Sequence, residues 1–171
     1  TSDALECEPA TFGEKSLFWG DLHVHTSYSL DANVYGTLAS PADAYRFAKG
    51  APMTRADGSI VQLARPLDFV AVTEHAEWLD FTSLCDNKHT KHLPDCDNLV
   101  SNRSPGGGPK LFGQYVLSSI AGPTPEPLTP CSEDPQMCRS AALDRWQSIQ
   151  EQTNAAYEPC KFTTLHGYEW S

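Results

Sequence analysis

The sequence predicts an α/β fold, because runs typical of buried strands alternate with segments that carry helix signals. Strand character is found in residues 16–25, 67–73 and 162–170. A capped helix signal lies between the first two runs, and the clearest helical segment of the chain lies before the last. The order strand, helix, strand, helices, strand is typical of βαβ units with parallel strands.

The two main helices are predicted from their ends and their spacing. Ser40 followed by Pro41 is typical of a helix start, with serine as N-cap and proline at the first helical position. Gly50 is a typical residue just beyond a helix end. A longer helix is predicted over residues 136–157, where apolar side chains recur at broadly helical spacing.

The remaining segments are predicted as one hairpin and several loops. The first strand is apolar enough for the centre of a sheet, and residues 53–64 predict a hairpin around Asp57-Gly58. The polar stretches 26–38 and 86–109 predict loops.

Length and charge narrow the class of protein. The 171 residues fit one domain, which we expect over residues 16–171 after a lead-in over residues 1–15. The formal charge of −10 argues against a nucleic-acid surface, which needs a basic face. No stretch approaches the roughly 20 apolar residues that span a bilayer, so no membrane span is expected.

Six cysteines predict disulfides rather than thiolate metal ligands, because none forms a CxxC pair. Cys85 and Cys96 bracket one polar loop, Cys131 and Cys138 bracket another, and Cys7 would then pair with Cys160. Other connectivities stay open, as does a cytosolic protein with free cysteines. Three disulfides favour an oxidising location, periplasmic or extracellular.

Residues that bind metals follow all three predicted strands. His23 and His25 close the first strand, and alternation along a strand places both on one face. Asp31 follows on the adjoining loop, His75 ends the second strand, and Glu169 ends the third. Because the carboxyl ends of parallel strands meet at one edge, these side chains predict a metal site there. An exposed or core histidine pair would explain His23 and His25 alone, but not three coincident strand ends.

Other histidines give weaker signals. His89 and His92 lie three residues apart between Cys85 and Cys96, which fits either a small zinc site or a solvated disulfide loop. His166 lies three residues before Glu169, so strand alternation turns it to the opposite face.

Three short motifs resemble those of the PHP (polymerase and histidinol phosphatase) superfamily. Residues 20–32 resemble its first motif, DLHxHTxxSxDG, with Ala32 in place of glycine. Residues 72–75 resemble the second motif, TDH, with Glu74 in place of aspartate, and residues 167–169 resemble the third, Gly-x-Glu. Residues 41–50 and 74–79 further resemble a family of large exported PHP-like proteins of unknown function, and the resemblance covers residues 17–171.

The resemblance implies the N-terminal portion of a distorted (β/α)7 barrel with long disulfide-stapled loops. His23 and His25 would bind one of two or three metal ions, Asp31 and His75 would serve a neighbouring ion, and Glu169 would bridge them. Asp31, His75 and Glu169 would be the catalytic ligands, and Asp21 and Glu74 would orient the histidines. Imidazole and carboxylate ligands suit Zn, Mn or Fe better than Ca.

The implied activity is metal-dependent hydrolysis of a phosphoester or related ester in a small-molecule substrate. PHP proteins take further ligands from later strands, so the remainder of the same precursor, or another chain, is expected to complete the barrel. The alternative is a non-catalytic module of an exported complex, in which metal only stabilises the structure.

Overall fold

The computed structural model describes residues 15–55, 57–117 and 130–170 of the chain. Its centre is a parallel sheet of β1 (Gly20–Val24), β4 (Phe69–Val72) and β5 (Thr163–His166), in the order β1-β4-β5. This confirms the predicted α/β class with parallel strands. The described residues form no closed barrel, and the expected lead-in lies outside them apart from Lys15.

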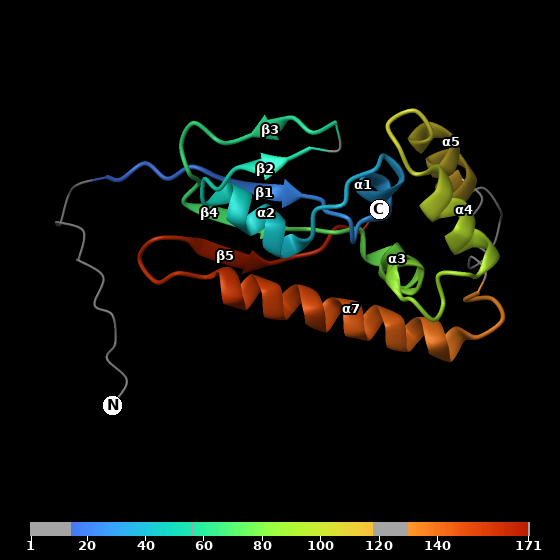
Figure 1. The fold of residues 1–171 in the computed structure, drawn as a ribbon. Helices are drawn as coiled ribbons and strands as arrows, with labels where there is room; N and C mark the ends of the chain where they lie inside the picture. Colours follow the sequence, from blue (N-terminus) through green and yellow to red (C-terminus); the bar gives the residue numbers. More distant parts are fainter. Residues whose placement is uncertain (1–14, 56, 118–129, 171) are drawn as a thin grey trace.

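Two helices pack against the sheet, as predicted. They are α2 (Pro41–Ala48) and α7 (Pro135–Ala156), and Figure 1 shows α7 running alongside β5. The Ser40 side chain accepts a hydrogen bond from the Asp43 N–H, and the Asp43 carboxylate accepts one from the Ser40 N–H. This capping box fixes the start of α2. Tyr45 of α2 packs with Val70, Val72 and Phe162 in the core between sheet and helices.

The central strand is β4, not β1 as the apolar first run predicted. Val70 and Val72 are 1% and 0% exposed, because β4 pairs on both edges and is covered by α2. In contrast, β1 pairs only with β4 among the described strands, and Leu22 is 56% exposed. Phe18 and Trp19, just before it, are also more than half exposed. Among the described residues, the apolar run therefore marks an edge strand with exposed apolar side chains.

Short helices gather beyond the carboxyl ends of the strands (Figure 1). They are α1 (Leu30–Val34), η1 (Ala76–Trp78), α3 (Leu79–Asp86), α4 (Pro94–Asn102), α5 (Gly108–Phe112) and the π-helical turn η2 (Gly113–Leu117). The predicted loops 26–38 and 86–109 are wrong where α1 and α4 lie. Both helices contribute to a shared core, in which Leu30, Val34 and Leu99 are fully buried.

The hairpin and two disulfides match their predictions. Strands β2 (Met53–Thr54) and β3 (Ile60–Val61) pair antiparallel. Disulfides join Cys85 to Cys96, and so α3 to α4, and join Cys131 to Cys138 at the start of α7. Cys160 is also disulfide-bonded, and its predicted partner Cys7 lies outside the described residues.

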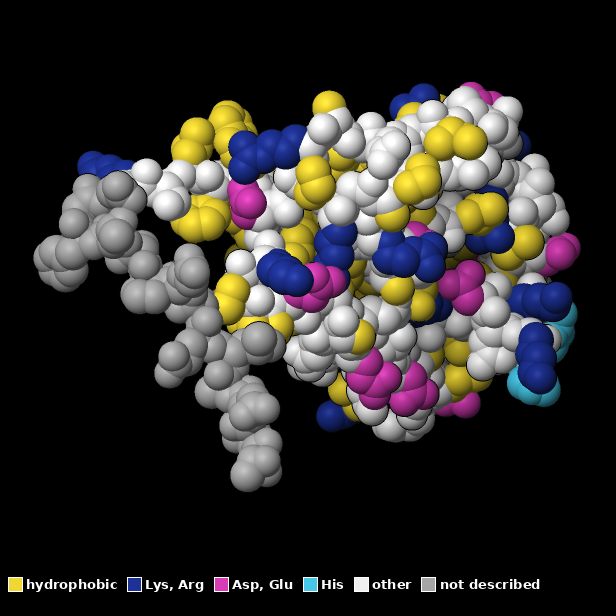
Figure 2. All heavy atoms as spheres, turned by 60° about the vertical axis from the view of Figure 1, so that its left-hand side comes forward, with side chains coloured by type: hydrophobic (Ala, Val, Ile, Leu, Met, Phe, Trp, Pro, Cys, Tyr) yellow, Lys and Arg dark blue, Asp and Glu magenta, His cyan; other side chains and the backbone are white. Residues whose placement is uncertain are grey.

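The surface carries charges of both signs. Figure 2 shows Lys and Arg side chains interspersed with Asp and Glu over the face in view, with no continuous basic area. None of the helices in the described ranges combines the length and apolar character that a bilayer crossing requires.

Candidate metal centre

Backbone pairing beyond the strand ends brings the predicted ligands together. His75 and Glu169 form an isolated parallel bridge that follows the β4–β5 ladder. The Ala76 N–H donates to the Glu169 carbonyl at 2.9 Å, and the Glu169 N–H donates to the Glu74 carbonyl at 3.0 Å. On the other side of β4, the Thr73 N–H donates to the Val24 carbonyl at 2.9 Å. The three strand ends are therefore fixed side by side.

The first ligand group consists of His23, His25 and Glu169. Glu169 Oε2 lies 3.1 Å from His23 Nε2 and 2.8 Å from His25 Nε2. The two imidazole rings stack with their centroids 4.8 Å apart. One carboxylate oxygen and two ring nitrogens thus converge on one point, as the alternation of His23 and His25 along the strand predicts.

The second group shares His25 and adds Asp31 and His75. Asp31 Oδ2 lies 2.7 Å from His25 Nδ1 and 3.8 Å from His75 Nε2. Glu169 Oε2 lies 4.0 Å from the same nitrogen of His75. All five predicted ligands therefore form one continuous cluster, in which Asp31 comes from α1 rather than from a loop.

The orientation of the polar atoms fits a bound cation. His25 Nε2 and Glu169 Oε2 are both buried and make no hydrogen bond, although they face each other at 2.8 Å. Buried polar atoms normally make hydrogen bonds, so two ligand-type atoms that converge without one suit a bound ion. The His23 side chain is 68% exposed, which leaves the cluster open towards solvent.

Asp31 is held in its charged form. Burial acts to raise its pKa, but hydrogen bonds from His25, Ser29 and the Ala32 N–H together lower the pKa below its usual range. A carboxylate that stays ionised in a half-buried position suits a ligand for a divalent cation.

Asp21 and Glu74 contact backbone rather than histidine rings. Asp21 Oδ1 accepts from the His23 N–H at 2.9 Å. Glu74 is 1% exposed, and its carboxylate accepts the Thr26 N–H at 2.9 Å and pairs with the Thr26 hydroxyl. These contacts fasten the segment after β1 to the end of β4, so both residues shape the backbone that carries the ligands.

Glu74 makes the metal-free protein sensitive to pH. Burial raises the pKa of Glu74 from 4.5 to about 7 against the hydrogen bonds from Thr26. A carboxyl with a raised pKa stabilises the fold fully below about pH 4.5, and that contribution is lost as the pH rises towards 7. We expect the unfolding free energy of the wild type to fall by about 2 kcal/mol between pH 5 and pH 7 from this group.

Glu74→Gln mimics the protonated carboxyl and should remove this pH dependence. The measurement is urea unfolding from pH 5 to pH 8 in the presence of chelator, with Glu133→Gln, at an exposed position, as the control. An equal slope in wild type and Glu74→Gln would contradict the assignment of the titration to Glu74.

Glu77 is an acidic residue near the cluster, and the sequence-based prediction of the ligands does not include it. Its Oε2 lies 3.9 Å from His75 Nδ1, on the side of the ring away from Asp31 and Glu169. The feature of the sequence that could have indicated Glu77 is its position two residues after His75, which the structure places in the first turn of η1.

The remaining metal-type residues lie apart from this centre. Asp80, Cys131 and Cys138 lie close together, but the two cysteines are joined in a disulfide and supply no thiolate. His166 hydrogen-bonds Asn154 at 3.0 Å, as expected from its opposite face. His89 and His92 are exposed, and neither belongs to a metal-type group within the described ranges.

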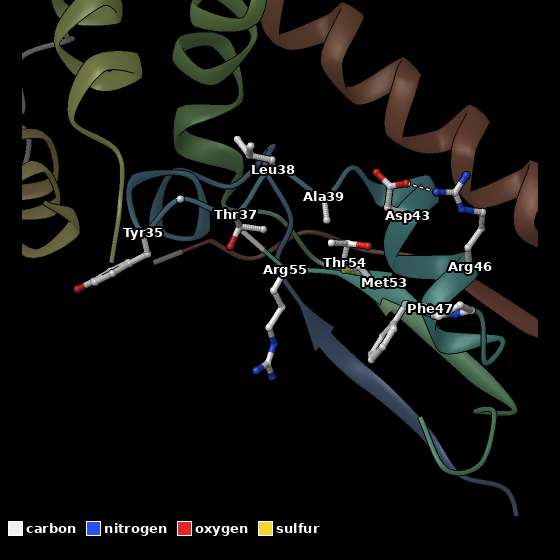
Figure 3. A pocket seen from close by; sticks show the side chains of 12 residues that line it. Tyr35, Thr37, Leu38, Ala39, Asp43, Arg46, Phe47, Met53, Thr54 and Arg55 are labelled. Atoms are coloured by element: carbon white, nitrogen blue, oxygen red, sulfur yellow. Dashed lines mark hydrogen bonds and ion pairs between the residues drawn. The ribbon is translucent and has the colours of Figure 1, made fainter. Parts of the chain in front are cut away.

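A groove of the structure lies away from this cluster. It has a volume of about 670 Å³ and runs between residues 35–39, α2 and β2 (Figure 3). None of the five predicted ligands lines it. Arg46, which does line it, is paired with Asp43 across the start of α2 (Figure 3). This groove is therefore separate from the ligand cluster at the strand ends.

Fold and site together define an α/β protein with histidines and carboxylates clustered as potential metal ligands at the carboxyl edge of a parallel sheet. The chain belongs to the family described as "Protein of unknown function (DUF3604)", which matches residues 13–171. No curated protein and no solved structure matches the sequence.

Proposed function

We propose that this chain carries the N-terminal part of a PHP-type metal-dependent hydrolase that acts on phosphoester or related ester bonds. The observation that carries the proposal is the convergence of His25 Nε2 and Glu169 Oε2, which are buried, 2.8 Å apart and without hydrogen bonds. Asp31 and His75 extend the same cluster on its other side. The resemblance of the three ligand-bearing motifs to PHP motifs supports the same reading.

Each ligand has a distinct part in the proposed site. His23 and His25 would hold one ion and Asp31 and His75 would serve a second, while Glu169, whose Oε2 faces all three rings, would join the two positions. When bound, Zn, Mn or Fe supplies positive charge that polarises an ester and lowers the pKa of a water molecule. The side chains of Asp31 and Glu169 would help to hold that charge in place, and the exposed side of His23 leaves room for a substrate.

The proposed setting is an oxidising compartment, periplasmic or extracellular. The two described disulfides support it, because such bonds are rare in reducing cytosol. We also propose that a further polypeptide, either the remainder of the precursor or another chain, covers the sheet and completes the barrel. Its support is the uncovered edge of β1 with its exposed apolar side chains, since such an edge readily pairs with further strands.

The first test is metal content, measured by elemental mass spectrometry on protein purified without chelator or added metal. We expect at least one equivalent of Zn, Mn or Fe per chain, and hydrolysis of p-nitrophenyl phosphate esters that chelator stops and the metal restores. Bound metal without hydrolysis of any ester would favour the structural module. No bound metal, and none taken up on titration, would contradict both.

A further inference from the structure

The two nitrogens of the His75 ring face carboxylates on opposite sides. Nε2 faces Asp31 Oδ2 at 3.8 Å and Glu169 Oε2 at 4.0 Å, inside the ligand cluster. Nδ1 faces Glu77 Oε2 at 3.9 Å, outside it. The side chains of His75 and Glu77 are only 13% and 17% exposed, so water screens their attraction weakly.

The local fold fixes His75 and Glu77 relative to each other. His75 is the N-cap of η1, and its N–H donates to Ser29 Oγ at 3.0 Å. The Trp78 ring meets the imidazole edge-on, with centroids 5.7 Å apart. Glu77 lies in the single turn between them. Backbone and ring are thus held, and the Glu77 carboxylate is placed against the outer nitrogen.

A histidine that binds a metal through Nε2 must keep its proton on Nδ1. A neutral imidazole carries one N–H and one lone pair, and a hydrogen-bond acceptor at one nitrogen fixes the lone pair on the other. Carboxylates commonly fill this place behind metal-binding histidines, where they also make the imidazole more basic. A separation of 3.9 Å is longer than a hydrogen bond, but hydrogen bonds at functional sites are often long in the unbound protein and tighten on binding.

We propose that Glu77 is a positioning residue: it accepts the Nδ1–H of His75 and so holds the Nε2 lone pair towards Asp31 and Glu169. The inference rests on the proposed function, because it assigns Glu77 a part in the same metal centre. Glu77 touches no substrate and no ion; it acts through His75. Its loss therefore lowers metal affinity without removing a ligand.

The test uses Zn²⁺ alone as the probe, with Glu77→Ala and Glu77→Gln as a pair. Both variants lose the negative charge, but the glutamine keeps an oxygen that can accept the Nδ1–H. We expect the Zn²⁺ dissociation constant to rise about 10- to 100-fold in Glu77→Ala and by clearly less in Glu77→Gln. Glu133→Ala, an exposed position, is the control for charge and should leave the affinity unchanged.

A spectroscopic readout separates positioning from a merely structural role. In ¹⁵N-labelled, Zn²⁺-loaded wild type, NMR should show the His75 Nδ1–H as a resonance protected from exchange with water. Glu77→Ala should lose that protection, and Glu77→Gln should keep part of it. If Glu77→Ala does not fold, Glu77→Gln alone decides: a shifted Nδ1–H resonance with weaker binding supports the proposal, and wild-type values for both overturn it.

The possible failures can be told apart. Equal losses of affinity in Glu77→Ala and Glu77→Gln would mean that Glu77 acts only as a charge, and the positioning role would fall. Unchanged affinity in Glu77→Ala would overturn that role while leaving the metal centre standing. A wild type that takes up no Zn²⁺ would overturn the proposed function, and this inference with it.

Discussion

His25→Ala should weaken metal binding by about 100-fold or more while leaving the fold intact. His25 is the residue shared by both ligand groups, with Nε2 facing Glu169 and Nδ1 paired with Asp31. Loss of groups that merely support a ligand costs about 10- to 100-fold in affinity, so loss of the shared ligand should cost at least as much. Competition with a chromophoric chelator measures the affinity, and circular dichroism measures the fold.

His166→Ala is the matched control for this change. His166 also lies on a strand of the sheet, but its ring turns to Asn154 and away from the cluster. Its removal should leave metal affinity within experimental error of the wild type. Equal losses in the two variants would mean that the effect comes from a damaged sheet. Unchanged binding in His25→Ala would place the metal centre elsewhere.

The sheet could be predicted from the sequence because its strands carry strong local signals, but its strand order could not. The first and second runs are both apolar, and composition alone suggested that each was buried. Only the pairing of β4 with both neighbours distinguishes them, leaving Val72 fully buried and Leu22 exposed. An apolar edge strand and an apolar central strand look alike until the fold shows what covers them.

The ligand cluster could be predicted because a single rule about parallel sheets brings its residues together. Parallel strands end at one edge, so residues that follow them in the sequence meet in space. The rule finds His25, His75 and Glu169 without any knowledge of side-chain contacts. It cannot find Glu77, whose place depends on the turn of η1, nor the pairing of Glu74 with Thr26 across 48 residues.

Replacing both Cys85 and Cys96 with alanine should lower the unfolding free energy by about 3 kcal/mol. The bond closes a loop with a sequence separation of 11, and both cysteines are buried in the core beside Leu99. Urea unfolding at constant pH measures the loss. A variant whose midpoint matches the wild type would show that the core alone holds the two helices together.

The same variant tests why α4 forms in a stretch without a helical apolar pattern. If the disulfide to α3 holds it, amide hydrogens of α4 should exchange quickly in the Cys85→Ala/Cys96→Ala variant while those of α7 stay protected. The comparison is Cys131→Ala/Cys138→Ala, which removes a bond of sequence separation 7 in the same core that does not involve α4 and should leave α4 protected. Retained protection in the first variant would instead mean that the packing of Leu99 stabilises α4. The sequence does not show this contact, because a buried leucine in a polar stretch makes no helical apolar pattern.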